Sequence, residues 1–486
     1  MENNEKRAEA WRVELRNALK AKDRTNIERV HMPELDPGYR SHNRVEEVNL
    51  GITAEQAMQE AKRCLDCANP SCMTGCPVGI DIPTFVKNIE RGDFLEAARV
   101  LKETSALPAV CGRVCPQEKQ CEGVCIHLKM KKDAVAIGHL ERFTADYERT
   151  SGNISVPKVA PANNIKIAGV GSGPAGLAFA GDMAKLGYEV VVFEALHEIG
   201  GVLKYGIPEF RLPNDIVDVE IQNLQAMGVH FITNCVVGKT ISIADLEQDG
   251  YKGIFVASGA GLPRFMNIKG ENLVGVMSSN EYLTRVNLMD AANPESDTPV
   301  FLGKKVAVIG GGNTAMDSVR TARRLGAERA ILVYRRSEEE MPARLEEVKH
   351  AKEEGIEFLT LHNPIEYKGN EQGRVTHMVL QVMELGAPDA SGRRSPVEIP
   401  GKTELIEVDE VIVSVGVSPN PLIPQSVKGL EVTKWGTVVV DNDTMQSAVP
   451  IIFAGGDIVR GGATVILAMG DGRRAAKAMD EWLKKN

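Results

Sequence analysis

Residues 165–194 constrain the fold more than any other part of the chain. The apolar run over 165–170 predicts a strand, the pattern over 174–186 predicts a helix, and a second apolar run ends at Glu194. The turn between the first strand and the helix has the spacing Gly-x-Gly-x-x-Gly, at Gly171, Gly173 and Gly176. This order of strand, glycine turn, helix and strand is typical of a dinucleotide-binding βαβ unit.

Each residue of this turn has its own task in such a unit. Gly171 permits the tight turn, Gly173 lets the backbone approach a pyrophosphate, and Gly176 lets the helix pack against the strand. The N-terminus of the helix offers unpaired N–H groups and a partial positive charge to the phosphates. Glu194 stands where a carboxylate accepts hydrogen bonds from the ribose hydroxyls. We therefore predict a nucleotide site here.

Other segments favour FAD over NAD as this nucleotide. Gly200 and Gly201 follow the second strand, as is usual in flavin enzymes of this fold. Gly259 ends another buried strand, and Gly456 and Asp457 follow a short strand near the C-terminus. Asp457 has two interpretations: it accepts a hydrogen bond from the flavin ribityl chain, or it caps the next helix. The expected contacts to this cofactor are completed by Pro174, Ala175, Arg211 and Thr464.

A second unit repeats this pattern, with a different ending. Its expected strand, helix and second strand cover residues 306–309, 314–325 and 330–334. The turn runs through Gly310, Gly312, Asn313, Thr314 and Ala315, with alanine as an accepted third position. The second strand ends in Arg335 and Arg336 instead of an acid. Arginine at this point accommodates the 2′-phosphate of NADP, so we expect NADP(H); the alternative is that both side chains are merely solvated.

Eight of the nine cysteines lie between Cys64 and Cys125. They form the runs C-x2-C-x4-C-x3-C-P and C-x3-C-P-x5-C-x3-C, at Cys64, Cys67, Cys72, Cys76, Cys111, Cys115, Cys121 and Cys125. Closely spaced thiolates followed by Cys-Pro are the run of bacterial ferredoxins, in which the last cysteine ligates a second cluster. We predict two 4Fe–4S clusters; two zinc sites are the alternative. Spacing alone does not choose the ligands within the second run.

Length, composition and charge exclude several classes of protein. The chain has 486 residues, a hydrophobic fraction of 43% and a net charge of −9, which argues against nucleic-acid binding. The N-terminus is charged and helical, without the apolar core of a signal peptide, and no apolar run is long enough for a membrane span. We expect a cytoplasmic protein, in which disulfides are improbable.

Taken together, these motifs resemble the family of the small (β) chain of NADPH-dependent glutamate synthase. The large subunit of the electron-bifurcating NADH-dependent ferredoxin:NADP oxidoreductase is also similar. The likeness covers nearly the whole chain, from RCLDC at 63–67 and CGRVCPQEKQCEGVC at 111–125 to the segment FAGGDIVRGGATVILAMGDGRRAA at 453–476.

The resemblance implies an α/β protein with two Rossmann-like domains, an FAD domain with an inserted NADPH domain, behind an α-helical iron–sulfur domain. The implied limits are 1–158 for the helical domain, 159–290 and 409–486 for the FAD domain, and 291–408 for the insert. One cluster is implied to take Cys64, Cys67, Cys72 and Cys125 as ligands. The other is implied to take Cys76, Cys115, Cys121 and Glu141, which leaves Cys111 as a bystander.

The resemblance also implies what the chain does. We expect an NADPH-dependent oxidoreductase subunit in which hydride chemistry at FAD is joined to single-electron transfer, with no side chain assigned as catalytic acid or nucleophile. Asn313 and the tail 463–479 lean toward the bifurcating enzyme, with the glutamate synthase β chain as the alternative. The expected partners are a flavin/iron–sulfur subunit that binds NAD, or a glutamate synthase large chain, with ferredoxin as a candidate acceptor. A non-catalytic, zinc-bearing scaffold is a second alternative.

Overall fold

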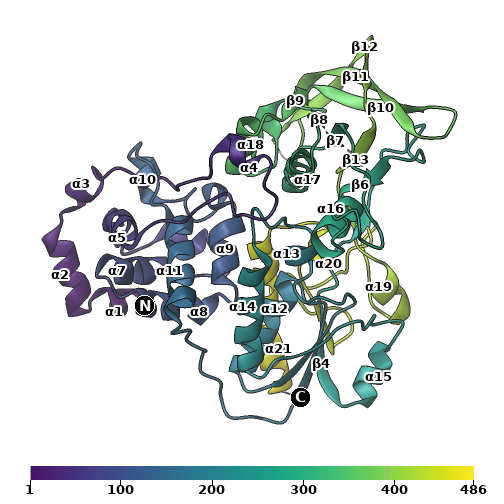
Figure 1. Ribbon diagram of the computed structural model, residues 1–486. Helices are drawn as coiled ribbons and strands as arrows, with labels where there is room; N and C mark the ends of the chain where they lie inside the picture. Colours follow the sequence, from purple (N-terminus) through teal and green to yellow (C-terminus); the bar gives the residue numbers. More distant parts are fainter. Residues whose placement is uncertain (1, 391, 486) are drawn as a thin grey trace.

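The computed structural model describes residues 2–390 and 392–485. Two five-stranded parallel sheets organise the chain, and an all-helical domain lies beside them (Figure 1). The first sheet has the order β15-β4-β1-β2-β3. Its strands are β1 (Lys166–Val170), β2 (Glu189–Phe193), β3 (His230–Ile232), β4 (Tyr251–Val256) and β15 (Ile452–Ala454).

Helices cover both faces of the first sheet. One face packs on α12 (Pro174–Lys185), α14 (Asn214–Ala226) and α21 (Val465–Leu483). The other face packs on α15 (Ile243–Gln248) and α19 (Leu422–Ser426). The strands are nearly continuous apolar runs because both of their faces are buried. The short helices α13 (Val202–Tyr205) and α20 (Asp457–Arg460) follow the loops at the carboxyl ends of the strands.

The second sheet has the order β6-β13-β7-β8-β9. Its strands are β6 (Val276–Ser278), β7 (Lys305–Ile309), β8 (Arg329–Tyr334), β9 (Glu357–Thr360) and β13 (Glu410–Val413). One face packs on α16 (Ser279–Leu288), α17 (Asn313–Arg324) and α18 (Leu345–Glu353). The other face packs on an antiparallel sheet, β10 (His362–Gly369), β11 (Val375–Pro388) and β12 (Arg394–Glu407), which projects from the molecule (Figure 1).

The second sheet takes in more of the chain than the expected insert at 291–408. Strands β6 and β13 lie on either side of those limits, and β13 pairs with both β6 and β7. Strand β13, which falls within the limits 409–486 implied for the FAD domain, therefore completes the second sheet and not the first. The chain enters and leaves this part through β5 (Leu262–Pro263) and β14 (Val417–Ser418), which pair antiparallel. This narrow ribbon is the covalent junction between the two sheets.

The helical domain is built from short helices, as the sequence indicated. They are α1 (Glu2–Arg7), α2 (Ala10–Ala18), α3 (Ala21–Arg24), α4 (Pro37–Arg40), α5 (Ala54–Lys62), α6 (Ser71–Thr74), α7 (Ile82–Glu90), α8 (Phe94–Thr104), α9 (Pro108–Val114), η1 (Gln117–Lys119), α10 (Ile126–Lys129) and α11 (Ile137–Ser151). Its core is continuous with that of the first sheet, since Val110 and Leu140 belong to the same apolar cluster as Leu177 and Met469. The two parts therefore pack as one body.

A buried ion-pair cluster joins the helical domain to the second sheet. Glu354, at the end of α18, accepts hydrogen bonds from Arg320 (2.8 Å), Arg324 (2.7 Å) and Arg40 (3.2 Å). Arg40 belongs to α4, which lies beside α18 in Figure 1. Although burial opposes the charge of Glu354, these guanidinium groups hold its pKa at about 2. The carboxylate is therefore charged throughout the neutral range.

We expect Glu354→Ala to destabilise the protein by about 3–5 kcal/mol, because it leaves buried guanidinium groups unpaired. The loss is measured as a lower denaturant midpoint. The control is Glu357→Ala, which breaks an exposed pair with Arg329 and should cost under about 1 kcal/mol. Because folding lowers the pKa of Glu354, the stabilisation is complete above pH 4.5 and declines toward pH 2. An unchanged midpoint in Glu354→Ala would contradict this expectation.

Candidate functional site

The first glycine turn lies between β1 and α12 and leaves room only where a phosphate is expected. Gly171 has a φ of +99°, and a side-chain Cβ there would lie 2.5 Å from the carbonyl oxygen of Ala257. A Cβ on Gly176 would overlap the carbonyl oxygen of Gly171. A Cβ on Gly173 would meet nothing within 4 Å. The backbone at Gly173 is thus the open point of the turn, at the N-terminus of α12.

Glu194 is buried at the end of β2 and faces this turn. Its carboxylate accepts hydrogen bonds from the backbone N–H groups of Ser172 and Leu196, both at 2.9 Å. The Ser172 hydroxyl also donates to Oε2, which leaves the second lone pair of Oε1 for a ribose hydroxyl. Gly201, with a φ of +56°, brings its own turn so close that a Cβ would lie 2.9 Å from the Cα of Gly173. The Gly200–Gly201 turn therefore borders the open point.

The loop after β15 reaches the same edge of the sheet. The Gly456 N–H donates to Asp471 of α21 at 3.0 Å, and a Cβ on Gly456 would lie 3.0 Å from that of Ala175. Burial raises the pKa of Tyr205 to about 12, and the charges of Asp457 and Glu194 add to the effect. Tyr205 therefore lies near both carboxylates, at the carboxyl ends of the strands where nucleotides bind in such folds. This arrangement fits FAD.

The second glycine turn has the same construction. Gly310 has a φ of +144°, and Gly312, whose Cβ would meet nothing within 4 Å, precedes α17. Arg335 is exposed at the end of β8. Arg336 is buried: it donates to Asp389 and to the carbonyl oxygen of Arg394, both at 2.8 Å, and so anchors the loop between β11 and β12. Of the two arginines, only Arg335 projects from the strand end toward solvent.

Arg211 differs from its expected role as a cofactor contact. Its guanidinium donates to both carboxylate oxygens of Asp317, at 2.6 and 2.8 Å, and pairs with Glu347 at 2.9 Å. These partners belong to α17 and α18 of the second sheet. The physical reason is charge: a buried guanidinium is most stable beside buried carboxylates, and two are present. Arg211 therefore ties the two sheets together.

The first set of thiols comprises Cys64, Cys67, Cys72 and Cys125, which line one cavity together with Pro70, Ser71, Ile82 and Ile126. Burial raises the pKa of Cys72, and the neighbouring sulfurs of Cys64, Cys125 and Cys67 raise it further. The structure thus brings together the four residues that were implied for the first cluster. Cys67 and Cys72 are only half-buried, so this set lies near the surface.

The spacing of the sulfurs bears on the choice between zinc and a cluster. Four thiolates around one zinc ion, each about 2.3 Å from the metal, lie about 3.8 Å apart. Within residues 2–390 and 392–485, no three of the thiol sulfurs lie within 4.8 Å of one another. Such a spread does not fit a single ion. A 4Fe–4S cubane takes its ligands on four separate iron atoms and so accommodates a wider spread.

The second set comprises Cys76, Cys115, Cys121 and Glu141. Burial raises the pKa of Cys76, with Glu141 and Cys115 contributing. Cys121 is affected in the same way by Glu141, Cys115 and Cys76. Burial raises the pKa of Glu141 to about 8, and among the described residues its Oε1 has no hydrogen-bond partner. An orphaned, buried carboxylate oxygen beside three thiols is the donor expected of a non-cysteine ligand.

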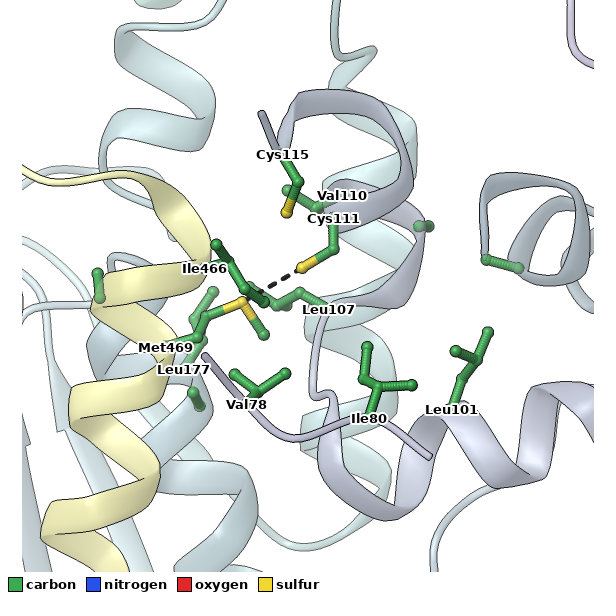
Figure 2. Close-up of a cluster of buried hydrophobic side chains, with 14 of the residues drawn as sticks. Val78, Ile80, Leu101, Leu107, Val110, Cys111, Cys115, Leu177, Ile466 and Met469 are labelled. Carbon is green, nitrogen blue, oxygen red and sulfur yellow. Dashed lines mark hydrogen bonds between the residues drawn. The ribbon is translucent and has the colours of Figure 1, made fainter. Parts of the chain in front are cut away.

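Cys111 lies between Cys115 and Met469 (Figure 2), and Cys115, burial, Glu141 and Cys76 all raise the pKa of its thiol. Its Sγ lies 3.5 Å from the Sδ of Met469 on α21, and both side chains are fully buried. One residue further along α21, a Cβ on Gly470 would lie 2.9 Å from the carbonyl oxygen of Pro77, which follows Cys76. Helix α21 begins after its N-cap Thr464, beside the loop of Asp457. It therefore connects the flavin edge of the sheet with the second set of thiols.

Two protein families match this chain, one for each half of the site. Residues 40–153 match the family of dihydropyrimidine dehydrogenase domain II, 4Fe-4S cluster, and residues 165–472 match the pyridine nucleotide-disulphide oxidoreductase family. The glutamate synthase [NADPH] small chain of Escherichia coli is 37% identical over 88% of this chain and 92% of its own length. This chain belongs to the glutamate synthase small-chain family.

One further relative and one solved structure are similar to this chain. The NADPH-Fe(3+) oxidoreductase subunit beta of Geobacter sulfurreducens is 37% identical over 89% of this chain and 66% of its own length. The solved structure of Mycobacterium tuberculosis FprA in complex with NADPH has a TM-score of 0.56 at 22% identity, over 66% of this chain and 85% of FprA. That likeness shows the fold alone.

Membership of the small-chain family confirms the main predictions. The chain is an NADPH-dependent flavin and iron–sulfur oxidoreductase with an α/β fold and an N-terminal 4Fe–4S domain. The zinc scaffold is thereby set aside. Among the described residues, no helix is long and apolar enough to span a membrane.

Sequence reasoning missed several residues at these sites. Ser172 donates to Glu194, Asp471 holds the Gly456 turn, and Tyr205 faces the flavin edge. Arg344 donates its backbone N–H to the Asn313 side chain at 2.8 Å. Only Ser172 had a usable signal, because a hydroxyl inside the glycine turn stands opposite the acid that ends β2. The others come from segments that are remote in the sequence.

Proposed function

We propose that this chain is the NADP(H)-binding, flavin and iron–sulfur subunit of a complex that couples NADPH oxidation to the reduction of ferredoxin and NAD. One observation carries the proposal. Helix α21 runs from the flavin edge to the second set of thiols, where Gly470 approaches Pro77 next to Cys76 and Met469 contacts Cys111, and the first set of thiols lies near the surface. The flavin edge and the two sets of cluster ligands thus form a series that ends near the surface of the molecule.

The residues of the chain have distinct tasks in this proposal. Gly173 and the N-terminus of α12 receive the FAD pyrophosphate, and Glu194 receives its ribose. Gly312 receives the NADP(H) pyrophosphate, and Arg335 its 2′-phosphate. When bound, FAD and the clusters supply the conversion between hydride and single electrons. Hydride transfer needs no side-chain acid, so no residue is assigned as one.

The four residues of each set serve as the ligands of one 4Fe–4S cluster. The orphaned Oε1 of Glu141 supports its place as the non-cysteine ligand of the second cluster. The half-buried position of Cys67 supports a contact with a partner at the first cluster. Burial raises the pKa of Cys72 in the first set and of Cys121 in the second, so these thiols would need a metal centre to be stable as thiolates.

A second function, that of the glutamate synthase β chain, is favoured by the Escherichia coli relative, which is a glutamate synthase [NADPH] small chain. The Geobacter relative is named for the reduction of Fe(3+), so members of this family serve different acceptors. Asn313 and the tail at 463–479 support the bifurcating complex. The identity of the partner subunit decides between the bifurcating complex and glutamate synthase.

The test is to purify the native complex anaerobically and to assay it in two ways. Ferredoxin reduction by NADPH that depends on added NAD supports the proposal. Formation of glutamate from glutamine and 2-oxoglutarate, without ferredoxin reduction, would overturn it and favour the β chain of glutamate synthase.

A further inference from the structure

Residues 342–345, which we call the bridge loop, lie between the second glycine turn and the segment that carries Cys115. On the nucleotide side, the Ala343 N–H donates to the carbonyl oxygen of Gly311 at 3.2 Å. The Arg344 N–H donates to the side-chain oxygen of Asn313 at 2.8 Å. Both acceptors belong to the turn that we assign to NADP(H). The loop thus fixes the turn through two hydrogen bonds from adjacent residues.

On its other side the bridge loop binds the segment around Cys115. The Arg344 guanidinium donates to the carbonyl oxygen of Arg113 at 2.5 Å and to the Gln117 side chain at 2.8 Å. The Lys119 ammonium donates to the first two carbonyl oxygens of the loop, at 3.1 and 3.2 Å. Arg113 and Gln117 each lie two residues from Cys115. The contacts therefore surround one ligand of the second set.

The contacts of the bridge loop are buried, which makes their loss costly. Arg344, Arg113 and Gln117 are all buried, and so is Ala343. A buried guanidinium that loses an acceptor costs more than an exposed one, because water cannot replace the acceptor. The Gln117 amide also faces the carbonyl oxygens of Cys111 and Gly112, each at 3.4 Å. A shift of the loop toward either neighbour would break hydrogen bonds to the other.

We propose that Arg344 is a positioning residue that couples occupancy of the NADP(H) turn to the segment around Cys115. Its backbone fixes the turn and its side chain fixes the segment, so an adjustment at one is transmitted to the other. Coupling of this kind is reciprocal: the state of the Cys115 segment changes the affinity for NADP(H) by the same factor. The inference rests on the assignment of the second glycine turn to NADP(H). It does not depend on which partner the complex contains.

The test uses the full chain with NADP+ and hydrogen–deuterium exchange. In the unaltered chain, NADP+ should slow exchange in residues 111–119 as well as in the glycine turn. In Arg344→Met, the protection of 111–119 should be lost, while that of the turn persists at saturating NADP+. The dissociation constant of NADP+ should rise about fivefold or more, the lower end of typical coupling between sites. The electron paramagnetic resonance signal of the second cluster should respond to NADP+ before the substitution and not after it.

The matched control is Lys349→Met. Lys349 also joins the second sheet to the helical domain, through Glu34 at 2.9 Å, but it touches neither the glycine turn nor the Cys115 segment. It should leave the protection of 111–119 intact. Lys119→Met removes the loop contacts from the opposite side and should weaken the protection without altering Arg344 itself. Retained protection in Arg344→Met, or equal losses in Lys349→Met, would overturn the inference. This test uses no ferredoxin assay, so the proposal about the partner can fail independently of it.

Discussion

Arg335→Ala should reduce the preference for NADPH over NADH by roughly 10- to 150-fold. Arg335 is exposed at the end of β8, where the 2′-phosphate of NADP is expected. A charged hydrogen bond to phosphate contributes about 1.5–3 kcal/mol, which converts to that range of affinity ratios. The measurement is kcat/KM for each coenzyme with an artificial acceptor. NADH has no 2′-phosphate, so its value should change little.

Arg336 provides the comparison within the same pair. Because its guanidinium is already engaged by Asp389 and by the carbonyl oxygen of Arg394, Arg336→Ala should lower thermal stability more than coenzyme preference. If Arg335→Ala keeps the full preference and Arg336→Ala loses it, the assignment is reversed. An unchanged preference in both variants would exclude the pair as the phosphate site.

The second large effect concerns the clusters. Cys115→Ala should remove about half of the iron and acid-labile sulfide, because one of two cubanes loses a thiolate ligand. Cys111→Ala should leave the iron content intact, since the side chain packs against Met469 and is not assigned as a ligand. Glu141→Ala should alter one cluster signal in electron paramagnetic resonance. The measurements are metal analysis and spectroscopy of anaerobically purified protein.

Cys111 and Cys115 make a sharp pair of variants because they lie one helical turn apart at the same site. Loss of half the iron in Cys111→Ala would refute its place as a bystander. An unchanged spectrum in Glu141→Ala would place the non-cysteine ligand elsewhere, and the orphaned Oε1 would then need another explanation.

Sequence reasoning succeeded where the information is local. Gly171 and Gly310 take positive φ values in turns that a motif of a few residues specifies, and the apolar runs before them form β1 and β7. The cysteine runs likewise predicted two sets of donors, because closely spaced ligands of a cluster must converge. The resemblance to a family supplied the choice within the second set, and the structure brings those residues together.

Sequence reasoning failed where partners are distant. Arg211 was expected at the flavin, but its partners Asp317 and Glu347 lie more than a hundred residues later in the chain. Arg336 was expected to bind the 2′-phosphate together with Arg335, but its guanidinium donates to Asp389 instead. The limits of the insert were also misplaced, because β6 and β13 are short strands whose pairing with each other is visible only in the sheet. No local pattern specifies such contacts.

The central claim is that one chain holds the NADP(H) turn, the flavin site and both sets of cluster ligands as a connected series. An anaerobic titration of the isolated chain with NADPH tests it most directly, with flavin and cluster absorbance followed together and the iron content known. The account predicts two 4Fe–4S clusters and one FAD per chain, and bleaching of both absorbances by NADPH without any partner. Flavin bleaching with clusters that stay oxidised under NADPH yet respond to dithionite, or zinc in place of iron, would contradict it.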